Sequence, residues 1–190
     1  MHRLTPIALG LAILIPLGCG TTRREVRDPP YVEQLRVRIT KVRHALMETR
    51  RTIALSQGAP YLPELYVRLA ELTSEEAKYH YRVAYEREQR STKALHVPQV
   101  RLLKEQAIST YRMVLRRFPR TPLAPRILFN IGHEYRELGE YEEMEKALDE
   151  LGDKYGSHPL AAEARLVMGD YYFDKNELPR ASEYYAKILA

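Results

Sequence analysis

The sequence has 190 residues, a single cysteine and a net charge of +5 at neutral pH. This length is enough for one domain with a hydrophobic core, and a lone cysteine excludes an internal disulfide. Residues 20–56 carry nine Arg/Lys against four Asp/Glu, residues 98–126 carry seven against one, and residues 127–190 carry seven against fourteen. A basic part joined to an acidic part indicates that electrostatics act in association, and it says little about fold.

Residues 1–18 have the features of a targeting segment. His2 and Arg3 form a short basic head, residues 6–17 are almost wholly apolar, and Leu17-Gly18 supplies a small-residue cleavage site. The apolar run is too short for a membrane-spanning helix, which needs roughly 20 residues. We therefore expect residues 1–18 to be a cleaved signal peptide.

Leu17-Gly18-Cys19 resembles the lipobox of bacterial lipoproteins. The resemblance implies that the Cys19 sulfur takes a diacylglycerol, that the chain is cut before Cys19, and that the new amino group is acylated. Gly20, in place of aspartate, implies an anchor in the outer membrane on its periplasmic face. Pro16 departs from the pattern, which has an aliphatic residue there, and the alternative is an ordinary secretory signal with an incidental cysteine. No cofactor is expected beyond these acyl groups.

Residues 19–30 are expected to form a tether, because Pro29-Pro30 prevents a helix from running through them. Residues 31–58 form a predicted helix that ends at Gly58. Its apolar positions have the alternating 3-4 spacing of a coiled-coil seam, with Thr49 in one slot: Val32, Leu35, Ile39, Val42, Leu46 and Ile53. Two interpretations remain open. The stripe either caps the helices that follow, or residues 32–53 pair with a second copy or a partner helix.

Residues 59–118 form a predicted first helical unit that starts at Pro63, a residue favoured at the first helical position. Residues 62–70 match residues 124–132 at an offset of 62, so this unit carries a long insertion. We expect the insertion to be a further helix, with Thr73 and Glu76 as its capping box. Pro98 then begins another helix that runs to about residue 118.

From residue 107 onward the chain repeats with a period of 37 residues. Ala107, Met144 and Ala181 stand in register, as do Gly132 with Gly169 and Tyr135 with Tyr172. A fixed period of large, small and proline positions predicts a solenoid of stacked units, and the lack of alternating strand patterns predicts an all-α fold. Residues 119–190 are expected to hold these repeats. The last helix stops before its stop signal, so we expect either further chain beyond Ala190 or a partner on the last face.

The repeats resemble the tetratricopeptide repeat (TPR) pattern of large residues, small residues at the helix crossing, and tyrosines. The matching residues are Pro119, Leu128, Ile131, Gly132, Tyr135, Gly139, Tyr141, Met144, Leu148 and Leu151, then Met168, Gly169, Tyr172, Ala181, Tyr185 and Ile188. Arg165, Asn176 and Gly156 depart from the pattern. The segments at 118–125 and 155–162 are similar to repeats of bacterial envelope proteins, namely lipoproteins of the outer-membrane β-barrel assembly machine and the periplasmic protein linked to Tol–Pal. The resemblance implies antiparallel helix pairs in a TPR-like α-solenoid.

The TPR resemblance also implies that the first helix of each repeat lines a concave groove that binds a partner. Carried over by position, the candidates are Glu64, Val67 and Glu71 in the first unit, Arg126, Phe129, His133 and Arg136 in the second, and Glu163, Leu166, Asp170 and Phe173 in the third. Phe129 and Phe173 lead this set, because the chain has only three phenylalanines. The alternative is that both pack against a neighbouring repeat.

Nothing in the sequence indicates catalysis. None of the six histidines pairs with another histidine or with Cys19 at metal-ligand spacing, and phosphate-loop and nucleophile-elbow motifs are missing. The arginines of residues 112–126 lack interleaved surface aromatics, so nucleic acid is not expected as a partner. We therefore expect a non-enzymatic, outer-membrane-anchored scaffold or adaptor that binds protein or peptide partners in the periplasm, as part of an envelope complex. The alternative is a coiled-coil-driven structural homo-oligomer whose repeats bind no peptide.

Overall fold

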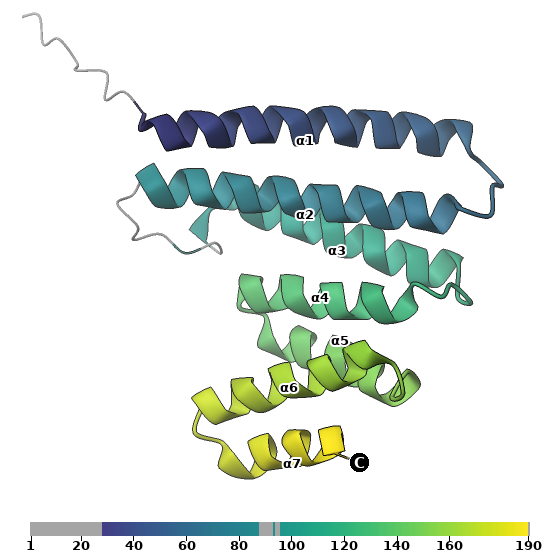
Figure 1. Cartoon of the computed structure of the whole chain (residues 1–190), viewed down its shortest axis with the longest axis vertical. Coiled ribbons are helices and arrows are strands. Elements are labelled where there is room, and N and C mark those ends of the chain that lie inside the picture. Colours follow the sequence, from purple (N-terminus) through teal and green to yellow (C-terminus); the bar gives the residue numbers. More distant parts are fainter. Residues whose placement is uncertain (1–27, 88–92, 94–95, 190) are drawn as a thin grey trace, which may run out of the picture.

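In the computed structural model the described residues are 28–87, 93 and 96–189, and they form seven α-helices and no strand. The helices are α1 (Pro30–Leu55), α2 (Leu62–Arg87), α3 (Pro98–Arg117), α4 (Ala124–Leu138), α5 (Tyr141–Lys154), α6 (Pro159–Asp174) and α7 (Leu178–Leu189). The predicted all-α class is confirmed: the chain is a TPR-like α-solenoid (Figure 1). The leader, Cys19 and most of the tether lie outside the described residues.

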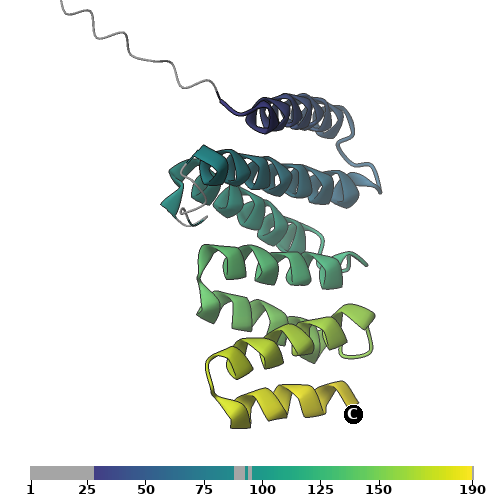
Figure 2. The same ribbon diagram turned by 60° about the vertical axis from the view of Figure 1, so that its left-hand side comes forward.

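The helices stack along one axis, from α1 at one end to α7 at the other (Figures 1 and 2). α2 packs on α3, α4 on α5 and α6 on α7, and α4 also contacts α6 directly. Ion pairing between Glu71 and Arg126 joins α2 to α4. The first helices of the three pairs therefore neighbour one another, as the TPR resemblance implies.

α1 covers α2 at the N-terminal end of the stack. All six apolar stripe residues of α1 are buried: Val32, Leu35, Ile39, Val42, Leu46 and Ile53. Val42 and Leu46 form a hydrophobic cluster with Leu72 of α2. In this conformation the stripe packs inside the chain, as the capping interpretation expects. Pairing of residues 32–53 with a second copy or a partner helix stays a prediction, and it would require this packing to open.

The insertion of the first unit lengthens α2 and α3 instead of adding a separate helix. The predicted start at Thr73 is wrong, because the Thr73 hydroxyl donates to the Leu69 carbonyl oxygen (2.8 Å) in the middle of α2. Glu76 does not cap either; it is buried and accepts from Arg43 Nε (2.6 Å). The added turns have their own small core, built from Ala77 of α2 with Val100 and Leu103 of α3.

The two in-register glycines lie at helix crossings, as the sequence predicts. A Cβ on Gly132 of α4 would lie 2.5 Å from Leu148 Cδ2 of α5, and a Cβ on Gly169 of α6 would overlap the Tyr185 ring of α7. Only a glycine permits such close approach of these helices. The tight turn after α4 uses Gly139 at φ 74°, and Asn176 takes the equivalent left-handed place at φ 60°.

The first junction between repeat pairs is an ion pair beside a tyrosine. Arg112 of α3 donates to Glu143 of α5 (3.2 Å), and its guanidinium lies 5.4 Å from the centre of the Tyr135 ring of α4. One arginine thus joins three consecutive helices, through a cation–π contact with the tyrosine ring and an ion pair with the carboxylate.

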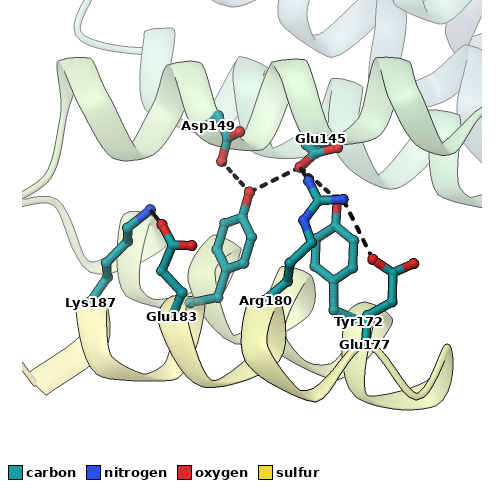
Figure 3. Close-up of polar contacts among 8 residues, drawn as sticks. Glu145, Asp149, Tyr172, Glu177, Arg180, Glu183 and Lys187 are labelled. Atoms are coloured by element: carbon teal, nitrogen blue, oxygen red, sulfur yellow. Dashed lines mark hydrogen bonds and ion pairs between the residues drawn. The ribbon is translucent and has the colours of Figure 1, made fainter.

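The second junction has the same parts with the charges exchanged (Figure 3). Glu145 of α5 accepts from Tyr172 of α6 (2.6 Å) and from Arg180 of α7 (2.7 Å). The Arg180 guanidinium lies 3.9 Å from the Tyr172 ring centre, and Tyr184 donates to Asp149 (2.9 Å). In the 37-residue register Asp149 corresponds to Arg112, and Arg180 corresponds to Glu143. The basic and the acidic position are therefore exchanged between the two junctions.

Candidate partner-binding face

α6 exposes the most complete set of predicted groove residues. Pro159 occupies its first turn, and the His158 side chain caps it by accepting from the Leu160 amide (3.2 Å). Ala161, Ala164, Met168 and Tyr172 are buried on its inner side. The other side, here called the α6 face, consists of the exposed residues Glu163, Leu166, Asp170, Phe173 and Asp174. Leu166 is 48% exposed and Phe173 is 59% exposed, so this face is an apolar pair set among carboxylates.

The α4 residues at equivalent positions are basic and mostly exposed. Arg126, His133 and Arg136 lie at the surface, whereas Phe129 is only half-buried and packs on the main core. For Phe129 the packing alternative is therefore the better description, and Phe173 alone presents an open ring. The basic row of α4 and the acidic row of α6 occupy equivalent positions of the 37-residue register, on two helices that contact each other.

The first unit contributes less to this face than predicted. Val67 is 3% exposed and belongs to the main core, so its assignment to the groove is wrong: the α2 face that it occupies packs inward. Glu71 is half-buried and forms an ion pair with Arg126. Glu64 is exposed, but it lines a different hollow together with Phe118.

Most of the basic segment is neutralised inside the stack. Arg101 lies 2.5 Å from Glu140, Lys104 lies 2.7 Å from Glu134, and further ion pairs join Arg112 to Glu143 and Arg126 to Glu71. Part of the charge asymmetry of the sequence therefore serves contacts between helices of the stack. This part is not available to a partner.

A partly buried ion-pair network lies beside the α4 residues. Lys104 Nζ reaches both Glu134 (2.7 Å) and Glu137 (2.6 Å), and His133 Nε2 lies 3.1 Å from Glu137. Burial lowers the pKa of Lys104, but the two carboxylates outweigh it and the net shift is upward. The His133 hydrogen bond and Lys104 lower the pKa of Glu137 to about 2 against its burial, and Glu137 in turn raises the pKa of His133.

Sequence reasoning missed one hollow of about 570 Å³ at the loop edge of the stack. It lies between the α1–α2 and α3–α4 connections and is lined by Pro60, Pro63, Glu64, Phe118, Pro119, Arg120, Thr121 and Pro122. The Arg117 guanidinium lies 5.4 Å from the Phe118 ring centre and donates to the Tyr66 hydroxyl (3.1 Å). Prolines gathered around two loops were the available signal, but sequence alone does not show that these loops meet.

Metal sites and membrane-spanning helices are absent from the described residues. No group of three or more His, Cys, Asp or Glu side chains there is placed to hold a metal ion. No described helix combines the length and apolarity needed to cross a bilayer.

Part of the chain resembles a known repeat family. The family model for the tetratricopeptide repeat matches residues 125–151, which cover α4, the Gly139 turn and most of α5. No curated protein matches the chain. TPR repeats commonly hold protein partners and are generally not enzymes. The chain thus contains a TPR repeat at residues 125–151 within a TPR-like stack of helix pairs, an arrangement that suggests a scaffold for protein–protein interaction.

Proposed function

We propose that this protein is an outer-membrane lipoprotein that holds a protein or peptide partner in the periplasm, as part of an envelope complex. The partner binds the side of the stack formed by α4 and the α6 face. Rigid helices suit this role, because their side chains keep fixed positions and little conformational entropy is lost when the partner binds.

The observation that carries the binding proposal is the exposure of Leu166 and Phe173. Both lie on one side of α6, two turns apart, and are 48% and 59% exposed. Large apolar side chains cost free energy in water, and exposed apolar patches with a polar rim mark interaction sites. The equivalent α4 residue, Phe129, is already packed against the core.

The anchor rests on the sequence of residues 1–30. Cys19 follows an apolar leader in a lipobox-like context, and α1 begins at Pro30. Residues 20–29 would reach at most about 35 Å when extended. Such a tether would keep the solenoid close to the membrane while leaving α4 and α6 free to bind.

The binding proposal is tested with a paired set of variants in the native host. Leu166→Ala with Phe173→Ala should sharply lower the recovery of cross-linked partner. The matched control is Val37→Ala with Met47→Ala on α1, since these side chains are 48% and 56% exposed. Equal recovery from the two double variants would refute the α6 face as the binding site.

The anchor proposal has its own test, which does not depend on the partner. Cys19→Ser removes the acceptor of the lipid, so the protein should leave the outer-membrane fraction and appear in the periplasm. Mass spectrometry of the wild-type amino terminus should find the acylated Cys19. A Cys19→Ser protein that still co-fractionates with outer membrane would show that lipid does not anchor it.

A further inference from the structure

We infer that the α6 face binds a basic amphipathic helix of the partner, with apolar side chains over Leu166 and Phe173 and lysines or arginines beside the carboxylates. This inference rests on the proposed function and names the chemistry of the partner. It follows from charge, exposure and spacing on α6.

The carboxylates of the α6 face are not neutralised within the described residues. Glu163 and Asp174 form no ion pair there, and Asp170 accepts only from the neutral Tyr185 hydroxyl (2.8 Å). By contrast, Glu134 and Glu143 are paired with Lys104 and Arg112. The α6 carboxylates therefore retain their charge for an external cation.

The end of α6 strengthens this negative potential. Asp170, Phe173 and Asp174 lie in its last turns, where the helix dipole adds partial negative charge. Lys175 follows directly, but its ammonium lies 4.5 Å from the Tyr171 ring centre, on the Tyr141 side. A partner cation beside Phe173 thus meets two carboxylates and the carbonyl end of a helix.

The basic residues of the neighbouring helix α4 do not reverse this preference for a cationic partner. Arg126 is paired with Glu71, and His133 with Glu137. Of the three basic groove candidates on α4, Arg136 forms no ion pair with the described residues, whereas the α6 face carries three carboxylates. Acidic peptides, nucleic acid and anionic lipid surfaces are therefore disfavoured at this place.

The spacing of the apolar pair favours a helix over an extended strand. Leu166 and Phe173 are seven residues apart, which is about 10 Å along a helix. Apolar side chains two turns apart on a partner helix have the same spacing, whereas same-face residues of a strand recur at roughly 7 Å. Helix-in-groove recognition of this kind uses apolar anchors flanked by charged positions.

The test uses two dye-labelled synthetic peptides of eighteen residues. Each has leucines on one helical face, and the other face carries lysines in one peptide and glutamates in the other. Fluorescence anisotropy with the purified mature chain should show binding of the lysine peptide and none of the glutamate peptide. Leu166→Ser with Phe173→Ser should weaken binding about tenfold or more, because the apolar contacts are lost. Binding should also weaken with added salt.

Charge-reversal variants separate a specific site from general attraction to an acidic protein. Glu163→Lys with Asp174→Lys should abolish binding of the lysine peptide. The control, Glu142→Lys with Asp153→Lys, makes the same change in net charge at exposed carboxylates of α5, and it should bind nearly as wild type does. Equal losses in both variants, after circular dichroism shows both to be folded, would overturn the inference.

Failure of this inference is distinguishable from failure of the proposed function. If partner capture depends on Leu166 and Phe173 but Glu163→Lys with Asp174→Lys leaves it unchanged, the α6 face binds a partner that is not basic. If light scattering shows a homo-oligomer that Phe173→Ser breaks apart, the occupant is a second copy. Either result contradicts the inference.

Discussion

Lys104 of α3 and Glu134 of α4 form an ion pair in the interior, with 2.7 Å between Nζ and Oε2 and side chains only 2% and 5% exposed. Ser74 of α2 also donates to Glu134, so three helices meet at one carboxylate. Buried charges of this kind fix which helices meet, because each is costly without its partner.

Removing one member of this pair should strongly destabilise the stack. Lys104→Met leaves Glu134 buried without its cation and should lower the free energy of unfolding by about 3–5 kcal/mol. Urea denaturation followed by circular dichroism measures this change. Adding Glu134→Leu should recover much of the loss, since an apolar pair leaves no charge unpaired. A loss below about 1 kcal/mol for the single variant would contradict the burial of this network.

Stability should depend on pH through Glu137. Its pKa falls from an ordinary 4.5 to about 2, chiefly through the His133 hydrogen bond. A carboxyl with a lowered folded pKa stabilises fully above about pH 4.5, and this contribution is lost as the pH falls toward 2. Glu137→Gln should therefore be less stable at neutral pH and fall less steeply on acidification. Its side chain is 42% exposed, so solvent screening keeps the effect modest.

The ion pair of His133 with Glu137 should also make the protein less stable as the pH rises. His133 has a raised pKa, so its contribution is present below its ordinary value of 6.5 and is lost as the pH rises through the folded value. Urea titrations at closely spaced pH values should show this decline in wild type and not in Glu137→Gln. Glu163→Gln is the control, because Glu163 has no ion pair among the described residues, and it should keep both slopes.

The surroundings of three glycines predict that alanine destabilises the protein at Gly132 and Gly169 and stabilises it at Gly152. Gly132→Ala would push a methyl group into Leu148, which is 3% exposed and held by the core. We expect a loss of about 1–3 kcal/mol in unfolding free energy. Gly169→Ala should cost less, because Tyr185 is only half-buried and can turn outward.

Gly152→Ala is the matched control within α5. The nearest atom to its added Cβ is Arg165 Nε at 3.9 Å, so the higher helix propensity of alanine should stabilise by up to about 1 kcal/mol. Thermal denaturation ranks the three variants. Stabilisation by Gly132→Ala would mean that α4 and α5 do not cross at this glycine.

The burial of the α1 stripe predicts a monomer. A chain that starts at Thr21 should give the monomer mass by light scattering. Leu46→Asp should destabilise by several kcal/mol, since Leu46 is 3% exposed, while Val37→Asp on the exposed side should be nearly neutral. A stable dimer that Leu46→Asp dissociates would restore the homo-oligomer alternative.

The sequence predicted the elements whose signals are local. Gly58, Pro63, Pro98 and Pro119 mark helix boundaries that the structure confirms to within a few residues. The 37-residue register also predicted the crossings at Gly132 and Gly169, because only small residues fit there. These signals need no knowledge of how distant helices pair.

Features that depend on pairing could not be predicted in this way. Thr73 looked like a cap because its local pattern fits one, but it lies inside α2, which packs against α1 at Leu72 and against α3 at Ala77. Val67 looked like a groove residue because the TPR register assigns it there, but it packs in the main core. The pairing of basic α3 with acidic partners likewise requires the three-dimensional arrangement.

The exchange of basic and acidic positions between the two junctions bears on the order in which the helix pairs stack. α5 offers Glu143 to Arg112 on one side and Glu145 to Arg180 on the other. If α6–α7 docked one repeat too early, onto α2–α3, Arg180 would face the side of α3 that carries Arg112, which holds the register position of Asp149. Like charges there would penalise this misplaced docking, so the charges of the junctions help to set the order of the hairpins along the stack.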